Sequence, residues 1–278
     1  LRLAARAAGR TSPNPMVGAV LVKGGKIISE DYHKKAGGPH AEALAITKAG
    51  AAASGATLYV ILEPCCHKDK RTPPCTEAII NAGIKRVVSA MKDPNPKVSG
   101  KGIKALKDAG IEVEAGLLER ESASLNEVYI KNITTGRPFV ILKAAMTLDG
   151  KIATPEGQSK WITGEKARRL VHKIRSQVDA VLTAIGTVKA DDPELTLRIS
   201  KNAKQPKRIV IDPRLEISPE ARILKHPPET YIVTQAENKK AKYLINMGIK
   251  LITYKDILEL NWLMKALAEK QIMSVLIE

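Results

Sequence analysis

The sequence predicts an α/β protein of two domains. Strand-like apolar runs alternate with helix-like segments through both halves of the chain, and Gly and Pro stand at many of the breaks between them. The length of 278 residues also exceeds the roughly 150 residues of an average domain. The segment Thr134-Thr135-Gly136-Arg137-Pro138 interrupts the pattern like a domain junction. We therefore expect one domain over residues 1–137 and a second over 138–278.

In the first half, turn and capping residues set the element boundaries. Gly24-Gly25 separates two strand-like runs and predicts a hairpin, Pro39 places a helix start at His40, and Gly83 and Gly110 end two further helices. We expect strands over 16–22, 26–28, 56–62, 86–90 and 112–115, and helices over 40–49, 76–82 and 102–109.

The second half repeats the alternation without an internal sequence repeat, so it is also predicted to be α/β. Its β-branched runs are short enough for buried strands, and its longer amphipathic segments suit helices. We expect strands over 139–146, 180–185, 208–211, 231–234 and 274–277, and helices over 165–176 and 258–270.

Composition narrows the function classes. The net charge of +16 suits nucleic acid, a membrane surface or a small phosphorylated ligand, but 3% aromatic residues supply little for stacking on single-stranded nucleic acid. Apolar runs fall short of the roughly 18–20 residues of a membrane helix, and Arg2, Arg6 and Arg10 leave no signal-peptide core. We expect a cytoplasmic protein that binds neither nucleic acid nor membrane. The absence of an initiator Met leads us to expect that the natural N-terminus is missing.

Three cysteines within eleven residues, at 65, 66 and 75, favour metal binding or catalysis over a disulfide framework. Zinc deaminases of bases hold the metal with one His and two Cys, while a Glu that is not a ligand moves protons. His40, Glu42, Cys65 and Cys75 occur in that order. Three protein ligands would leave a fourth position for water. We predict His40, Cys65 and Cys75 as zinc ligands and Glu42 as the proton carrier.

The predicted zinc site depends on where His40 and the two cysteines lie relative to helices, and the same residues have an alternative interpretation. His40 and Glu42 would point to different sides inside a helix, so they can act together only if His40 lies at the helix start. Both cysteines are expected at helix starts, where amide dipoles favour thiolates. Cys65 and Cys75 are ten residues apart, not three. In the alternative, His40 merely caps a helix and the cysteines are small core residues.

Longer motifs resemble the bifunctional bacterial riboflavin-biosynthesis enzymes over nearly the whole chain. In the first half they include the run Thr11–Val20, Glu63-Pro64-Cys65-Cys66-His67, Thr72-Pro73-Pro74-Cys75 and Asp93-Pro94-Asn95-Pro96. In the second half they are the runs Lys143–Ala153, Ser159–Gly164 and Thr187–Arg198.

The resemblance implies a cytidine-deaminase-like domain followed by a dihydrofolate-reductase-like α/β domain. It implies zinc-dependent deamination of 2,5-diamino-6-ribosylamino-4(3H)-pyrimidinone 5′-phosphate, then reduction of the ribosyl side chain to ribityl with NADPH. The expected partner is this small phosphorylated pyrimidine, and we expect a homo-oligomer. The chain has no G-x-G-x-x-G in a Rossmann context, so the cofactor would bind by other residues.

Site residues follow from the resemblance position by position. The cofactor contacts it implies are Ala145, Trp161, Thr187 and Asp191. The substrate contacts it implies are Asn14, Asp93 and Asn95 in the first domain and Ser159, Arg175, Leu195, Arg198 and Glu278 in the second. Arg175 and Arg198 suit a phosphate because their forked donors bind it bidentately.

The sequence departs from the family pattern at two places, and two other functions compete with the one that the resemblance implies. The loop Lys68-Asp69-Lys70-Arg71 carries one residue more than many relatives, and the sequence stops at Glu278, where the family continues into a Gly-Gly cofactor loop. We therefore expect an incomplete reductase domain. One competing function is a nucleic-acid-base deaminase with an unrelated appended domain. The other is a non-catalytic, zinc-stabilised binding module, which would not need Glu42.

Overall fold

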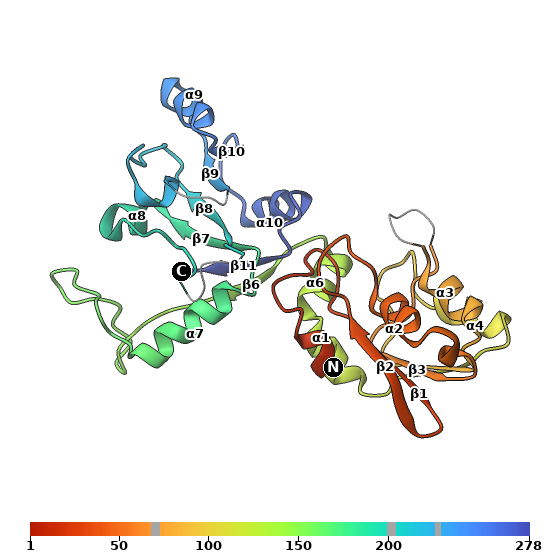
Figure 1. The fold of residues 1–278 in the computed structure, drawn as a ribbon. Coiled ribbons are helices and arrows are strands. Elements are labelled where there is room, and N and C mark those ends of the chain that lie inside the picture. Colours follow the sequence, from red (N-terminus) through yellow and green to blue (C-terminus); the bar gives the residue numbers. More distant parts are fainter. Residues whose placement is uncertain (68–72, 199–203, 226–228) are drawn as a thin grey trace. The chain divides into compact units, whose positions relative to one another are not determined.

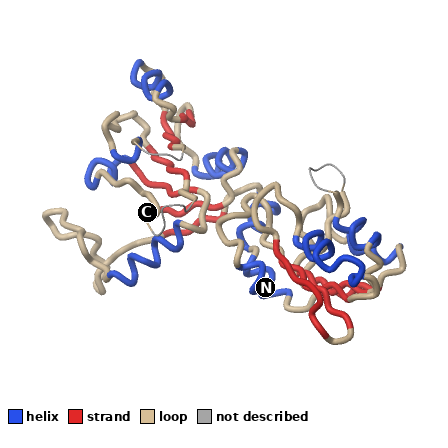
Figure 2. Tube along the Cα trace, viewed as in Figure 1, coloured by secondary structure: helices blue, strands red, loops and turns tan. Residues whose placement is uncertain are grey.

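The computed structural model describes residues 1–67, 73–198, 204–225 and 229–278. The chain divides into two compact units, Leu1–Arg137 and Pro138–Glu278. Each unit has its own sheet and its own apolar core, as the separate groups of strands in Figures 1 and 2 show. The two units are described separately below.

The first unit is built on a mixed five-stranded sheet of order β2-β1-β3-β4-β5. The first two strands form a hairpin across Gly24 and Gly25, whose φ angles of 56° and 72° lie in the left-handed region that glycine adopts without strain. β1 runs antiparallel to β2 and β3, whereas β3, β4 and β5 run parallel. The strands are β1 (Gly18–Lys23), β2 (Lys26–Tyr32), β3 (Thr57–Val60), β4 (Arg86–Ser89) and β5 (Glu112–Ala115).

Helices that pack on this sheet bring the site residues together. α2 (Ala41–Ala49) lies against β1 and β2 and beside α3 (Cys75–Asn81), which in turn contacts α4 (Lys101–Asp108) (Figure 1). Alanines and branched side chains from the sheet and from α2 and α3 form the buried core between them. The other helical segments are α1 (Arg2–Ala5), the 3₁₀ turn η1 (Gly50–Ala53), α5 (Glu119–Leu125) and α6 (Glu127–Thr135).

The second unit is built on a six-stranded parallel sheet of order β10-β9-β8-β7-β11-β6. Alternate residues of its inner strands enter two different cores, one on each face. Burial on both faces explains their continuous apolar sequence. The strands are β6 (Phe139–Leu142), β7 (Ala180–Ala184), β8 (Lys207–Ile211), β9 (Thr230–Thr234), β10 (Lys250–Thr253) and β11 (Ser274–Ile277).

The helical segments of the second unit are α7 (Glu165–Arg175), α8 (Ile185–Asp191), the 3₁₀ turn η2 (Arg222–Leu224), α9 (Lys239–Asn246) and α10 (Leu260–Glu269). The Asn238 side chain caps α9 by accepting a hydrogen bond from the Ala241 amide at 3.0 Å. Within the described part of the chain, no helix combines the length and the apolar character that crossing a membrane would require.

The predicted elements all exist, but their ends and their number differ. The strand predicted over 139–146 ends at Leu142, where its register with β11 closes at the pair Ile277 and Leu142. Five α-helices and one strand of the described residues were not predicted from the sequence: α1, α5, α6, α8, α9 and β10.

Candidate active sites

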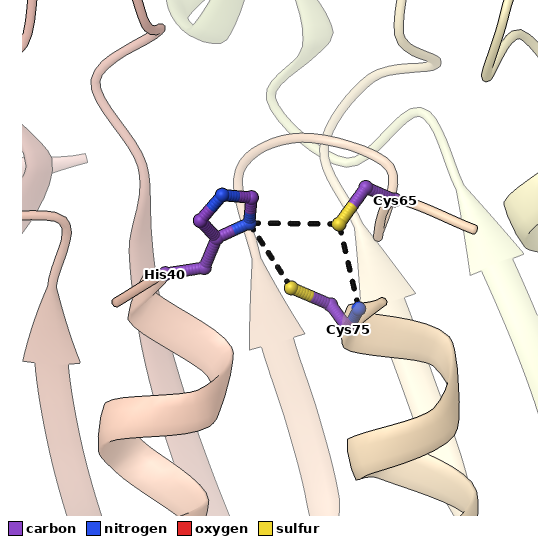
Figure 3. Close-up of side chains that lie close together, drawn as sticks. All are labelled: His40, Cys65 and Cys75. Carbon is purple, nitrogen blue, oxygen red and sulfur yellow. Dashed lines mark hydrogen bonds between the residues drawn. The ribbon is translucent and has the colours of Figure 1, made fainter. Parts of the chain in front are cut away.

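Three predicted ligand residues converge in the first unit. His40 Nδ1 lies 3.2 Å from Cys75 Sγ and 3.5 Å from Cys65 Sγ, and the three ligand atoms all lie within 4.8 Å of one another (Figure 3). Zinc bonds of about 2.3 Å to sulfur and 2.0–2.1 Å to nitrogen would put tetrahedral neighbours about 3.5 Å apart. The cluster therefore has the dimensions and the donor chemistry of a zinc centre with three protein ligands. The loop 68–71, with its extra residue, lies outside the described residues.

Each ligand comes from a different element. His40 is the N-cap of α2 in an extended conformation, which confirms the predicted position at the helix start. Cys75 is the first residue of α3, and its amide donates to Cys65 Sγ at 3.4 Å. The expectation of two helix starts was wrong for Cys65, which lies in the loop after β3. Cys65 nevertheless faces a helix start, that of α3, because the two cysteines meet across the site.

Glu42 lies in the first turn of α2, two residues after His40. Its side chain is 3% exposed, and Oε2 is buried without a hydrogen-bond partner among the described residues. Burial raises the pKa of the Glu42 carboxyl, although the adjacent His40 opposes the shift. A buried carboxylate oxygen without a partner is costly unless a ligand or water meets it. Glu42 is thus placed beside the ligand cluster with an acceptor to spare.

Asn14 reaches the site through His33, a residue that the sequence analysis did not select. His33 Nδ1 lies 2.9 Å from the Pro39 carbonyl and Nε2 lies 3.1 Å from Asn14 Nδ2. The carbonyl accepts only from a protonated Nδ1, so Nε2 accepts the hydrogen bond that Asn14 donates. The rings of His33 and His40 meet edge to face at 5.6 Å. His33 therefore holds Asn14 and the backbone just before His40 in one arrangement.

Glu63 fixes the other side of the ligand cluster. Its side chain is 2% exposed and accepts backbone hydrogen bonds from Asp93 at 3.2 Å, Gly100 at 2.9 Å and Ile103 at 3.1 Å. The last two amides belong to the N-cap and first turn of α4, so Glu63 caps this helix from another part of the chain.

Gly102 makes this junction possible. A Cβ at Gly102 would lie 2.0 Å from the Pro64 carbonyl oxygen, inside any permitted contact. Glycine is therefore required where α4 passes the backbone next to Cys65. The loop that carries Cys65 and the start of α4 are packed backbone to backbone.

Asp93 and Asn95 lie in the loop after β4, next to this junction. Asp93 is 5% exposed, and its Oδ1 accepts from the Asn95 amide and from the Tyr129 hydroxyl, each at 2.9 Å. Burial raises the pKa of the Asp93 carboxyl, and the nearby Glu63 and Cys65 add to the shift. The two predicted substrate contacts thus share one hydrogen-bonded loop, within electrostatic range of the ligand cluster.

In the second unit, two predicted substrate residues contact each other. The Arg175 guanidinium pairs with both carboxylate oxygens of Glu278, at 2.6 and 2.8 Å, and donates to the Thr196 carbonyl at 3.2 Å. Lys143 Nζ also binds Glu278, at 3.1 Å. Two of the five N–H donors of Arg175 are therefore engaged with Glu278 and a third with Thr196. Arg175 orients this acidic group, and its other two N–H bonds have no acceptor among the described residues.

Arg198 lies near the same cluster but is free to turn outward. Its side chain is 63% exposed and pairs with Glu194 at 3.7 Å. Burial lowers the pKa of His172, and the positive charges of Arg175 and Arg198 lower it further. His172 Nδ1 is buried without a hydrogen-bond partner among the described residues. Basic groups from α7 and from the segment after α8 therefore gather around Glu278.

The predicted cofactor residues are less closely grouped. Asp191 pairs with Lys160 at 3.6 Å, and the Trp161 ring, 73% exposed, carries the Arg168 guanidinium over its face at 4.4 Å. Ala145, Ser159 and Thr187 are half-buried. Leu195 was predicted as a substrate contact, but its side chain is buried in the core, so only its backbone can reach a ligand.

An open pocket of about 350 Å³ adjoins α8 on the side of Val188 and Lys189. The predicted contacts Thr187 and Asp191 are not among its lining residues. The structure therefore brings Arg175 and Glu278 together, whereas the four predicted cofactor contacts lie on three segments: Ala145 after β6, Trp161 before α7, and Thr187 and Asp191 on α8.

Sequence reasoning missed His33, Glu63 as a helix cap, and Tyr129. Their contacts link residues from 6 to 40 positions apart in the chain. No local spacing rule connects such pairs. Only Glu63 carried a signal, since it stands in the run Glu63–His67 beside a predicted ligand.

The comparisons with known proteins agree with this description. Residues 1–91 match the family described as the cytidine and deoxycytidylate deaminase zinc-binding region, and residues 138–278 match the RibD C-terminal domain. A riboflavin biosynthesis protein RibD of Aquifex aeolicus is 50% identical over 279 residues, covering 100% of this chain and 78% of the relative.

Two solved structures match the whole chain. RibD of Acinetobacter baumannii is 44% identical with a TM-score of 0.92, and this chain covers 77% of it. A deaminase/reductase of Thermotoga maritima, titled diaminohydroxyphosphoribosylaminopyrimidine deaminase/5-amino-6-(5-phosphoribosylamino)uracil reductase, is 42% identical with a TM-score of 0.91, and 78% of it is covered. Each match includes 100% of this chain.

Proposed function

Because the chain belongs to the RibD family, whose deaminase and reductase domains serve riboflavin biosynthesis, we propose that residues 1–137 deaminate and residues 138–278 belong to the reductase. The proposed substrate is 2,5-diamino-6-ribosylamino-4(3H)-pyrimidinone 5′-phosphate, and NADPH is the proposed reductant. The observation that carries the proposal is the cluster of His40, Cys65 and Cys75 beside the unpartnered oxygen of Glu42.

The roles in deamination follow from the chemistry of these side chains. His40, Cys65 and Cys75 would hold zinc, and the bound metal would supply a nucleophile by lowering the pKa of a water towards 7. Glu42 accepts a proton from the attacking water and delivers it to the departing amine, so it acts first as a base and then as an acid. Its burial supports both roles, because a raised pKa makes the carboxyl a better base and an available acid.

Substrate binding is assigned to the surrounding loops. Asn14, held by His33, and the loop of Asp93 and Asn95 supply amide and carboxylate groups for the hydroxyl and amide edges of the substrate. These residues orient the ring carbon that loses its amine and exclude competing water.

In the reductase unit, we assign Arg198 to the phosphate and Glu278, which Arg175 and Lys143 both hold, to the ribosyl hydroxyls. Arg198 is exposed and can turn towards an anion, whereas Arg175 is held by Glu278. Arg198→Ala is expected to weaken reduction by about 1.5–3 kcal/mol of transition-state binding. Deamination should be unchanged, since Arg198 lies in the other unit. Equal loss in both half-reactions would indicate general destabilisation instead.

One experiment separates this proposal from its competitors. The purified chain, loaded with zinc, is assayed for ammonia release from the pyrimidine phosphate and from a cytosine-containing oligonucleotide. We expect release from the first substrate only. Release from the oligonucleotide would favour a nucleic-acid deaminase, and release from neither substrate by zinc-loaded protein would favour a binding module.

The assembly and the compartment are proposals of the same kind. We propose a homo-oligomer in the cytoplasm, acting on a small phosphorylated ligand without nucleic acid or membrane. Light scattering of the purified chain would test the oligomer directly, and a monomer mass at micromolar concentration would overturn it.

A further inference from the structure

Three polar side chains form one row along the helices that close the first unit. Ser122 lies in α5, Asn126 joins α5 to α6, and Tyr129 lies in the first turn of α6. Their spacing of four and three residues places them on one face of the helical segment. We call Ser122, Asn126 and Tyr129 the polar row.

Each member of the polar row holds a different segment of the deaminase site. The Ser122 hydroxyl donates to the Ile61 carbonyl at 2.6 Å, just after β3 and four residues before Cys65. Asn126 binds the Met16 backbone at both ends, accepting from its amide at 2.9 Å and donating to its carbonyl at 3.1 Å, two residues after Asn14.

Tyr129, the third member of the polar row, binds a side chain, whereas Ser122 and Asn126 bind backbone groups. Its hydroxyl donates to Asp93 Oδ1 at 2.9 Å. Burial and the Asp93 charge raise the pKa of the Tyr129 phenol, so it keeps the proton that it donates. Oδ1 also accepts from the Asn95 amide, so two hydrogen bonds restrain one carboxylate oxygen, and in this inference Oδ2 is the oxygen that meets the ligand.

We propose that the polar row on α5 and α6 is a positioning element of the deaminase, in which Tyr129 aligns Asp93 for a substrate hydroxyl. This inference rests on the proposed deamination and names the residue that controls substrate affinity at that site. The contacts support it because Ser122 and Asn126 are buried and all four hydrogen bonds end on segments that carry site residues. The fully buried side chains of this helical segment, Ser122 and Asn126, are both polar, whereas Leu125 of α5 packs partly buried against the small apolar cluster of Ala4, Ile61 and Ala90. Polar contacts therefore add to apolar packing in placing these helices.

The direct test is Tyr129→Phe, which removes the hydroxyl and keeps the ring. Asp93 is assigned to substrate binding and not to proton transfer, so its misalignment should weaken binding of substrate and transition state together. We expect KM for deamination to rise about 3- to 10-fold with kcat within about twofold, the size of effect that loss of one ordinary hydrogen bond produces. Zinc content and the melting temperature should match the wild type.

Tyr59→Phe is the matched control, since Tyr59 lies exposed on β3 in the same unit. A double-mutant cycle with Asp93→Asn then tests whether Tyr129 acts through Asp93. If it does, Tyr129→Phe adds less than about twofold in the Asp93→Asn background. An additive loss, or an effect equal to that of Tyr59→Phe, would show that the hydroxyl has only a structural role and overturn the inference.

The same assays separate this inference from the function on which it rests. No ammonia release by the zinc-loaded wild-type chain overturns the proposed deamination and this inference with it. Normal release with an unchanged KM in Tyr129→Phe overturns the positioning role alone.

Discussion

A substitution of Glu42 gives the most direct test of the proposed deamination. Glu42→Gln keeps the size of the side chain and its hydrogen bonding but cannot carry a proton. Loss of a general acid–base group costs roughly a hundredfold to ten-thousandfold in rate, so kcat for deamination should fall by that factor. Zinc content should stay at one per chain, because the ligands are His40, Cys65 and Cys75. Unchanged deamination would contradict the mechanism, and lost zinc would make the comparison a metal effect.

Glu278 makes a prediction about stability and pH. Burial alone would raise the pKa of the Glu278 carboxyl, but Arg175 and Lys143 outweigh it and hold that pKa below its usual 4.5. A pKa lowered by folding adds stability above the unfolded value of about 4.5, and this stability is lost as pH falls through the folded value.

The comparison of wild type with Glu278→Gln isolates this contribution. At pH 7 the free energy of unfolding of the variant should be lower than that of the wild type by about 1.5–3 kcal/mol, the range for hydrogen bonds to charged groups. The difference should shrink as the pH falls below 4.5, because the wild-type carboxyl is then protonated. Urea unfolding of both proteins at several pH values measures it, and a constant difference would argue that packing, not charge, is responsible.

At the scale of elements, the start of α4 is the part of the first unit least tolerant of change. Gly102→Ala introduces a Cβ against the Pro64 carbonyl, so the Cys65 loop or α4 must move. We expect a loss of about 1–3 kcal/mol in stability, the usual cost of overpacking, together with weaker zinc binding. Denaturant unfolding and zinc titration measure the two effects.

Gly186→Ala is the matched control for this change. Gly186 is likewise the second residue of a helix, α8, but nothing lies within 4 Å of a Cβ built there. The control should be neutral or stabilising by up to about 1 kcal/mol, since alanine favours helix. If Gly102→Ala and Gly186→Ala changed the free energy of unfolding equally, the close approach of α4 to Pro64 would not contribute to the effect.

The elements also show what the sequence could predict. Strands and helices with buried apolar faces were predicted because their apolar residues recur in the sequence with a regular pattern, as in β7 to β9. α5 and α6 leave only a weak periodic pattern, because their fully buried side chains, Ser122 and Asn126, are polar and the apolar Leu125 is only partly buried. The ligands His40, Cys65 and Cys75 were predictable from residue type and order. The groups that hold the site, His33 and Glu63, act over long sequence distances and were not.

At the scale of the whole molecule, the two units have separate cores and should unfold separately. Scanning calorimetry should therefore show two transitions. Zinc binds the folded first unit only, so removing it with a chelator should lower one transition and leave the other in place. The shifted transition should be the one that Gly102→Ala also lowers. Equal shifts of both transitions would mean that the units unfold as one cooperative block.

The strand order of the second unit has a consequence for the growing chain. β11 lies between β6 and β7, so residues 139–142 pair with residues 274–277, far along the chain. During synthesis, β6 has no neighbour in this sheet until β11 has left the ribosome, which slows closure and exposes an apolar edge. Tyr129, by contrast, completes the first unit as soon as α6 has emerged. A ribosome that pauses after all of residues 1–137 have left its exit tunnel would display a finished deaminase site, whereas any pause before β11 emerges would hold an open sheet for chaperones to protect.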